Sequence, residues 1–490
     1  MATSHQNNPH AILISYPLQG HVIPSVHLAI KLASKGFTIT FINTDAIHNQ
    51  IMAGSSSSST NGDDIFALVR KSGLDIRYTT VSDGLPVGFD RSLNHDQFMS
   101  GLLHVFSAHV EEAVEKIIKK GPQVCCLIAD TFFVFPGMLA KKYDLLYVSF
   151  WTEAALVFTL YYHLDLLRLN RHFACNDLCD EPITYVPGVK SINPKDLTSY
   201  LQDMNTTTVC HQIIFKAFQD TRDYADFVLC NTLEDLESDT IKALHKKVPF
   251  FAVGPIFPIG KFSVATSLWS ESDCGHWLNT MPNGSVLYVS FGSYAHVTKH
   301  DLLEIAYGLS ESKIRFLWVL RPDIVSSDDN NPLPDDFMTE IGKRGMVVPW
   351  CNQTQVLSHP AIGGFLTHCG WNSSLESIWS EVPLLCFPLL TDQFTNRKLL
   401  VDDWKIGINL CDQVRITRVE VLKKIKILMN QESGNVFRKS IKELKNKFEK
   451  ALRKDGSSER NINQFINELK VKIQKKKEAN IAEKCLPNGH

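Results

Sequence analysis

Short apolar runs alternate with longer amphipathic stretches along the chain, and this pattern restricts the fold more than any other feature. Such runs are typical of strands buried in a parallel sheet, and the amphipathic stretches between them are typical of covering helices. In the first half the predicted strands are Ala11–Tyr16, Thr38–Ile42, Val124–Asp130, Tyr147–Phe150 and Phe227–Asn231. In the second half they are Val286–Ser290, Phe316–Leu320, Met346–Pro349, Gly364–Thr367 and Leu384–Phe387. Because each half carries its own set, the pattern predicts an α/β protein with two doubly wound domains.

The length supports this division, because 490 residues exceed what one ordinary hydrophobic core accommodates. A run rich in glycine and proline, from Gly254 to Gly260, interrupts the periodicity as a connection between domains does. We therefore predict an N-terminal domain over residues 1–253, a linker over 254–272, a C-terminal domain over 273–455 and a final segment over 456–490. The Lys-rich end of that last segment is expected to fray.

Composition and charge exclude several classes of partner. A net charge of −2 gives no long-range attraction to nucleic acid or anionic membranes. No run of about 18 apolar residues is present, so no membrane span is expected. The 12 cysteines follow neither a disulfide framework nor a metal-binding spacing, which favours free thiols in a reducing compartment. We expect a cytoplasmic monomer that holds no metal ion and no cofactor.

Two polar residues follow predicted strands of the first half. His21 comes after a Pro/Gly loop and just before a helix expected from about Pro24, and Asp130 closes the strand Val124–Asp130. Ligands of open α/β sheets bind at the carboxyl ends of strands, so both side chains are candidates for one cleft. His21 could act as a general base, with Asp130 fixing its tautomer. The alternatives are a solvent-facing His21 and an Asp130 that caps a helix.

The stretch from Trp350 to Gln393 carries the densest set of candidate ligand-binding side chains. Trp350 follows a strand that Pro349 stops, and an aromatic ring there can stack on a flat base or simply fill the core. His368 to Ser373 form a turn from strand to helix, where free N–H groups and the positive end of the helix dipole suit a phosphate. The Ser290–Ser293 loop resembles a phosphate-binding turn more weakly.

The same stretch ends in acidic and amide side chains that suit hydroxyl groups. Ser373 and Glu376 fit a helix capping box, but Glu376 could instead accept from two ribose hydroxyls. Asp392 and Gln393 follow the last predicted strand, and a carboxylate beside an amide suits a polyol. A polar turn is the alternative for this pair.

In span and order, Trp350–Gln393 resembles the signature box of the plant family 1 UDP-glycosyltransferases. The Gly20–Pro24 segment, the Tyr288–Ser293 segment and Val253-Gly254-Pro255 are also similar to that family. The resemblance implies the GT-B fold, in which two Rossmann-like domains face each other across a cleft. It also implies that the last helix, at about residues 457–469, returns to the N-terminal domain.

The resemblance further implies roles for residues at matching positions. His21 is expected to be the catalytic base and Asp130 its partner. The first donor to test is UDP-glucose. The expected contacts are Trp350, Cys351 and Gln353 at the uracil and ribose end, and Glu376 at the ribose. Those at the phosphates are Ser293, His368, Asn372 and Ser373, and those at the sugar are Trp371, Asp392 and Gln393.

These residues predict an inverting transfer of glucose to a hydroxyl group of a small lipophilic acceptor, such as a phenolic or terpenoid. The segments expected around the acceptor are Asp83–Asn94, Phe132–Phe135, Trp151–Leu167 and Val186–Leu201. The alternative is a catalytically silent protein that binds a nucleotide sugar or another small molecule. An oxidoreductase is disfavoured because no G-x-G-x-x-G motif follows the first strand.

Overall fold

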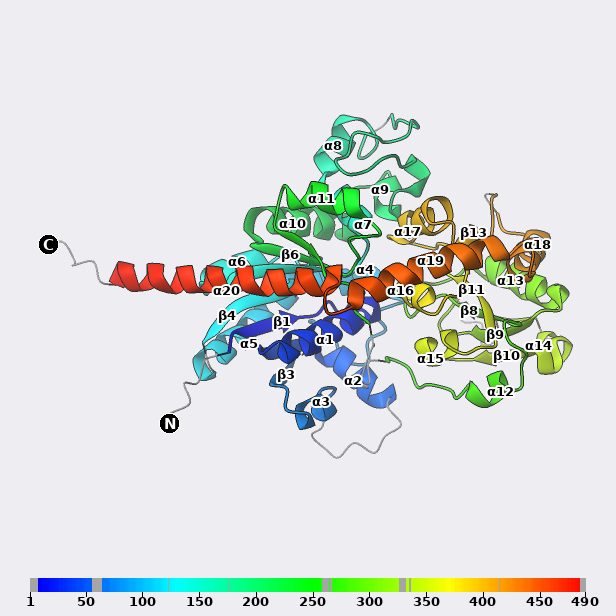
Figure 1. Cartoon of the computed structure of the whole chain (residues 1–490), viewed down its shortest axis with the longest axis horizontal. Helices are drawn as coiled ribbons and strands as arrows, with labels where there is room; N and C mark the ends of the chain where they lie inside the picture. The colour runs from blue at the N-terminus through cyan, green and yellow to red at the C-terminus, as the bar shows by residue number, and fades with distance from the viewer. Residues whose placement is uncertain are drawn as a thin grey trace.

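Two parallel sheets, each flanked by helices, form the two lobes of the molecule (Figure 1). The structure is a computed structural model that describes residues 8–54, 64–121, 123–175, 177–257, 264, 267–325, 332–334, 336–413 and 415–484. Much of the predicted linker at 254–272 and the last residues of the predicted frayed tail lie outside these ranges. The proposed domain boundaries therefore stay a prediction.

The first lobe contains a seven-stranded sheet of order β3-β2-β1-β4-β5-β6-β7. Its strands are β1 His10–Ile14, β2 Thr38–Thr44, β3 Ile76–Val81, β4 Val124–Asp130, β5 Leu146–Trp151, β6 Phe227–Cys230 and β7 Phe250–Ala252. Its helices are α1 Gln19–Ser34, α2 Asp45–Gly54, α3 Ala67–Lys71, α4 His95–His104, α5 Phe106–Lys120, α6 Pro136–Lys142, α7 Ala155–Tyr162, α8 Leu164–Leu169, η1 Pro194–Asp196, α9 Ser199–Gln202, α10 Val209–Tyr224 and α11 Ser238–His245.

The second lobe contains a six-stranded sheet of order β10-β9-β8-β11-β12-β13. Its strands are β8 Val286–Ser290, β9 Arg315–Val319, β10 Gly345–Val348, β11 Ile362–Thr367, β12 Leu384–Cys386 and β13 Gly407–Asn409. Its helices are α12 Gly275–Asn279, α13 Lys299–Ser312, α14 Phe337–Ile341, η2 Gly342–Arg344, α15 Gln353–Leu357, α16 Trp371–Trp379, α17 Gln393–Lys398, η3 Leu399–Asp403, α18 Arg418–Met429 and α19 Asn435–Leu452.

The sequence pattern located ten of these strands and missed β3, β7 and β13. All three lie at sheet edges. β3 is only partly buried and carries polar residues, and β7 and β13 have three residues each. A short or half-exposed edge strand lacks the continuous apolar run that marks a central one.

The last helix, α20 Ser457–Lys484, leaves the second lobe and runs along the first (Figure 1). Its apolar side chains Ile462, Phe465, Ile466 and Leu469 are buried in the core of the first lobe. Glu459 pairs with Lys31 of α1 and with Lys35, the residue just after α1, at 2.9 Å each. The crossing back of this helix, expected from the resemblance, is thus present. Among the helices of the described ranges, none combines the length and apolar character that crossing a bilayer requires.

Candidate active site

A cavity of about 1150 Å³ is lined by residues of both lobes. In the first lobe its walls begin where β1 and β5 end, and in the second lobe where β8, β10, β11 and β12 end. All but one of the predicted site residues line it. The exception is Asp130, which is buried behind His21.

His21 lies in the first turn of α1, which begins five residues before the expected helix start at Pro24. Its Nδ1 is 2.7 Å from Asp130 Oδ2 and 2.9 Å from Thr152 Oγ1. The His21 side chain is 12% exposed and that of Asp130 1% exposed. With Nδ1 donating to the carboxylate, Nε2 is the nitrogen left to accept a proton. The alternative of a solvent-facing His21 is therefore wrong.

Asp130 does not cap a helix, because the next helix, α6, begins at Pro136. Its Oδ1 instead accepts from the backbone N–H of Phe132 at 3.0 Å. The rings of Tyr16 and Phe132 lie 5.3 and 5.7 Å from the His21 ring. Hydrogen bonds and aromatic packing together fix the orientation of the imidazole.

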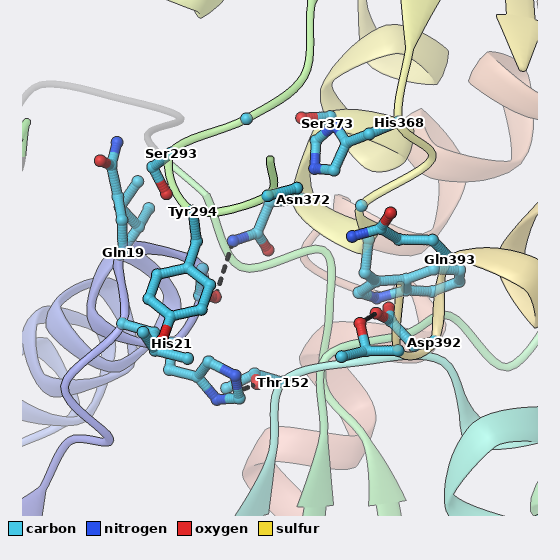
Figure 2. A pocket seen from close by; sticks show the side chains of 18 of the residues that line it. Gln19, His21, Thr152, Ser293, Tyr294, His368, Asn372, Ser373, Asp392 and Gln393 are labelled. Carbon is cyan, nitrogen blue, oxygen red and sulfur yellow. Dashed lines mark hydrogen bonds between the residues drawn. The ribbon is translucent and has the colours of Figure 1, made fainter. Parts of the chain in front are cut away.

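Pro24 explains one contact between the lobes. A proline inside a helix has no N–H, so the carbonyl four residues earlier lacks its helical partner. That carbonyl belongs to Gly20, and it accepts from Asn372 Nδ2 of α16 at 2.8 Å (Figure 2). The bond ties the turn that carries His21 to the helix start in the other lobe. The Asn372 amide nitrogen keeps a second proton for a ligand.

The start of α16 has the features of an anion-binding site. Within the described residues, the first helical hydrogen bond runs from Ser374 N–H to the Gly370 carbonyl, which leaves the N–H groups of residues 371–373 without a backbone acceptor. Ser293 faces this end across the cavity (Figure 2). Free N–H groups and the helix dipole favour a negatively charged group here.

His368 lies between two glycines next to this helix start. A Cβ atom on Gly292 would come within 2.6 Å of His368 Nε2, and one on Gly370 within 2.4 Å, so glycine is required at both positions. Burial, together with the charge of Arg321, lowers the pKa of His368 to about 4. The imidazole is therefore neutral near pH 7 and can offer a ligand a hydrogen bond without carrying a charge.

The capping-box alternative for Ser373 and Glu376 is wrong. The cap residue of α16 is Gly370, and no side chain caps this helix. Glu376 is buried, and its Oε2 accepts from Gln353 Nε2 at 2.7 Å, while the same nitrogen reaches Ser373 Oγ at 2.9 Å. Burial raises the pKa of Glu376 to about 7, and the bond from Gln353 opposes that shift. A buried carboxyl with one partner has capacity left for ligand hydroxyl groups.

Trp350 and Cys351 lie beside this cluster on the cavity wall, and both are buried. The Trp350 ring packs against Trp269 with ring centroids 6.3 Å apart. An aromatic wall next to a buried hydroxyl-binding carboxyl suits a flat base attached to a ribose.

Asp392 and Gln393 line the same cavity and are drawn below His368 and Ser373 in Figure 2. Asp392 lies in a turn just before α17, as the alternative interpretation expected. The two side chains are nevertheless buried, with exposed fractions of 7% and 5%. Gln393 Oε1 accepts from the backbone N–H groups of Leu389 and Leu390 at 2.9 and 3.1 Å, which leaves its amide nitrogen available. Burial raises the pKa of Asp392, although hydrogen bonds from Thr391 and Asn396 oppose the shift.

The Trp371 side chain has no hydrogen-bond donor left for a ligand in the cavity, unlike the expectation from the sequence. Its indole N–H donates to the backbone carbonyl of Asn231 in the first lobe at 2.7 Å. An indole has a single donor and no acceptor, so only the Trp371 main chain remains for a sugar.

Sequence reasoning missed part of the first-lobe wall. Thr152 beside His21 belongs to the expected segment Trp151–Leu167, but α4 and α10, which contribute His95, Met99, Cys210 and Ile213, were not expected. In contrast, no residue of the expected segment Asp83–Asn94 lines the cavity. No local motif marks α4 or α10, because only the tertiary packing brings them to the wall. Across the part of the chain that the structure covers, no cluster of His, Cys, Asp or Glu could hold a metal ion.

Comparison with known proteins agrees with this geometry. The family model described as UDP-glucoronosyl and UDP-glucosyl transferase matches residues 71–446. UDP-glycosyltransferase 86A2 of Arabidopsis thaliana is 61% identical over 469 residues, which cover 95% of either chain. The 7-deoxyloganetin glucosyltransferase of Catharanthus roseus is 34% identical, over 96% of this chain and 98% of its own.

Solved structures show the same fold. Phytolacca americana UGT2, in complex with UDP-2fluoro-glucose and pterostilbene, matches with a TM-score of 0.75 and 27% identity, over 95% of this chain and all of its own. Medicago truncatula UGT71G1 with UDP-glucose matches with a TM-score of 0.77 and 25% identity, over 94% and 98%. The two sheets therefore form a GT-B fold. The chain belongs to the UDP-glycosyltransferase family and is a UDP-glycosyltransferase of small molecules.

Proposed function

We propose that this enzyme transfers glucose from UDP-glucose to a hydroxyl group of a small lipophilic acceptor, with inversion at the sugar and with His21 as the general base. One observation carries the proposal. The His21 ring, held at 2.7 Å by buried Asp130, lines the same cavity as the helix start of α16 and the Asp392–Gln393 pair. A proton acceptor of the first lobe thus faces a nucleotide-sugar wall of the second.

The proposed donor site follows the wall from one end to the other. Trp350 would stack on uracil, the Cys351 main chain and Gln353 would contact uracil and ribose, and Glu376 would accept from the ribose hydroxyls. Ser293, His368, Asn372 and Ser373 would contact the phosphates. The Trp371 main chain, Asp392 and Gln393 would hold the sugar hydroxyl groups.

In the proposed reaction, His21 Nε2 removes the acceptor proton while the acceptor oxygen forms a bond to C1 of the sugar. The bond from C1 to the phosphate oxygen breaks, and UDP leaves with the electron pair. Asp130 stabilises the imidazolium that forms. The growing charge on UDP meets the free N–H groups at the start of α16 and the hydrogen bond of His368.

Magnitudes rank these contributions. A general base typically supplies about 10² to 10⁴ in rate, or roughly 3 to 5 kcal/mol. Alignment of two substrates in one cavity can supply about 7 to 11 kcal/mol. Positioning by the two lobes is therefore expected to contribute more than the base.

Glucose is proposed as the sugar for two reasons. A glutamine at the end of the signature box usually accompanies glucose transfer in the resembling family, and Gln393 occupies that position. Two of the similar proteins are also connected with glucose: one is called a glucosyltransferase, and one was solved with UDP-glucose. Apolar and aromatic side chains on the first-lobe wall, among them Phe132, Tyr161 and Tyr200, support a lipophilic acceptor.

The test is to incubate the purified protein with UDP-glucose and a panel of phenols, terpenoid alcohols and plant hormones, and to measure UDP release and glycoside mass. UDP release above the rate of UDP-glucose hydrolysis, together with a product one glucosyl unit heavier, is expected for at least one acceptor. UDP-glucose binding without any product across the panel would favour the silent binding protein instead.

A further inference from the structure

One ionisable side chain of the cavity has no place in the mechanism above. Glu153 follows Thr152 in the connection between β5 and α7 and lines the cavity. Its Oε2 atom is buried and has no hydrogen-bond partner among the described residues. The side chain is only partly buried as a whole, so the rest of it faces the cavity. A buried polar atom without a hydrogen-bond partner is unfavourable because it has lost its hydrogen bonds to water, so this atom requires an explanation.

A structural role at the helix start does not explain Glu153. The residue before α7 is Ala154, and no side chain caps this helix. The N–H groups of Ala155 and Leu156 donate instead to the carboxylate of Glu237, at 3.0 and 2.7 Å. Only the backbone carbonyl of Glu153 is used, by Cys230 Sγ. Within the described residues, no hydrogen bond of the helix start uses its carboxyl group.

Two observations connect Glu153 with both of the proposed reacting ends. Its neighbour Thr152 contacts His21, and the acids that interact with its carboxyl are Asp392 first and Asp130 second. Burial, with added repulsion from these two acids, raises the pKa of Glu153 well above its ordinary value. A neutral carboxyl group both donates and accepts hydrogen bonds, as a hydroxyl ligand requires.

We propose that Glu153 is a specificity-determining residue whose carboxyl group binds one hydroxyl group of the bound substrates, on the sugar or on the acceptor. This inference rests on the proposed function, because it places the sugar at Asp392 and the acceptor at His21. A ligand carboxylate in place of this hydroxyl group would be repelled by the carboxylate of Asp392. Ligands with a neutral hydroxyl group are therefore favoured over acidic ligands. Since Glu153 lines the same cavity as Asp392 and the repulsion from Asp392 exceeds that from Asp130, the sugar is the first source to test.

The experiment compares Glu153→Ala with wild type on matched ligand pairs. In the sugar arm, Kd by calorimetry and kcat/KM are measured for UDP-glucose and for its 4-deoxy and 6-deoxy analogues. In the acceptor arm, a dihydroxy acceptor and its monohydroxy counterpart are compared with UDP-glucose as donor. For the ligand that carries the bound hydroxyl group, we expect Glu153→Ala to lower kcat/KM or affinity by about 10- to 100-fold. For the matching ligand without that hydroxyl group, we expect the same substitution to change these quantities by about twofold or less.

Two controls sharpen this result. Glu153→Gln keeps a donor and an acceptor and is expected to preserve most of the preference for the hydroxyl group. Glu271 also lines the cavity and contacts Asn352 near Trp350. Glu271→Ala is expected to shift hydroxyl and deoxy ligands by the same factor.

Equal effects of Glu153→Ala on both members of every pair, or no effect, would overturn the inference. Failure of the variant to fold would appear as lost UDP binding, in which case Glu153→Gln against Glu153→Leu replaces it. The calorimetric sugar arm does not require turnover. An enzyme that transfers no glucose but binds UDP-glucose with a Glu153-dependent preference would refute the proposed function and leave the hydroxyl subsite standing.

Discussion

The two walls of the cavity are built in different ways. Most of the second-lobe wall comes from one stretch, Trp350 to Gln393, in which β11, α16 and β12 follow each other closely. The first-lobe wall is assembled from α1, α4, the β5–α7 connection, α9 and α10, which are scattered over more than half of that lobe's sequence. The proposed donor wall is thus local in sequence, whereas the proposed acceptor wall depends on long-range packing.

Because the walls are built differently, we expect them to contribute differently to UDP binding and to turnover. On the proposed donor wall, Gln353 Nε2 already donates to both Ser373 and Glu376, so this end is preorganised within the second lobe. On the first-lobe wall, Asp130 and Thr152 support the His21 ring. His95 of the same wall contacts Tyr294 Oη at 2.6 Å and Cys210 Sγ at 3.2 Å. We therefore expect substitutions in the first-lobe wall to affect turnover and substitutions in the second-lobe wall to affect UDP affinity.

The largest expected effect follows from His21→Ala. Loss of the proton acceptor is expected to lower kcat by about 10² to 10⁴, because a general base typically contributes that much. UDP affinity, measured by calorimetry, is expected to stay within about threefold of wild type, since the donor wall is intact. Unchanged turnover in this variant would reject the assignment of the base.

The next effect concerns stability of the ligand-free enzyme. The pKa of Glu376 is about 7 in the folded protein and near the ordinary glutamate value when unfolded. The folded state therefore keeps a proton that the unfolded state loses, and stability falls as pH rises from about 4.5 to about 7, by roughly 3 kcal/mol in full.

The measurement is the melting temperature against pH for wild type and Glu376→Gln. His368, with a pKa of about 4, gives a slope of opposite sign in an overlapping range, so the difference between the two proteins is the relevant quantity. Wild type is expected to lose several degrees more than the variant between about pH 5 and pH 7. Parallel curves would contradict the burial of a protonated Glu376.

Glu376→Ala tests the donor wall itself. Loss of the hydrogen bonds to ribose is expected to weaken UDP binding by about 10- to 100-fold, because bonds to an ionisable group contribute about 1.5 to 3 kcal/mol. UDP lacking both ribose hydroxyl groups is expected to bind the variant and wild type alike. A variant that loses the same factor for both nucleotides would show that Glu376 acts on structure and not on ribose.

Asn372→Asp gives the smallest expected effect and tests the link between the walls. A carboxylate cannot donate to the Gly20 carbonyl, and it would also face the phosphates. We expect kcat/KM to fall by about 5- to 10-fold more than in Asn372→Ala, which removes the bond without adding a charge. If Asn372→Ala itself leaves kcat and UDP affinity unchanged, the contact between α1 and α16 has no part in positioning.

The same contrast explains what could be predicted from the sequence. The residues of the proposed donor wall could be picked out because they lie within one segment, whereas α4 and α10 were missed because only tertiary packing brings them to the cavity. The capping box at Ser373 was a reasonable alternative that failed, since the helix begins two residues earlier, at Trp371. Pro24 was read as a helix start, but its missing N–H instead leaves a carbonyl for the other lobe.

The central claim is that the reaction is a single displacement. His21 of the first lobe activates the acceptor hydroxyl group, which attacks C1 of the sugar held by the second lobe, on the side opposite to the departing UDP. The most direct test is the configuration of the anomeric carbon in the product, determined by proton NMR of the glucoside made from α-linked UDP-glucose. A β-glucoside is the predicted product. An α-glucoside formed by the wild-type enzyme would contradict direct attack across the cavity.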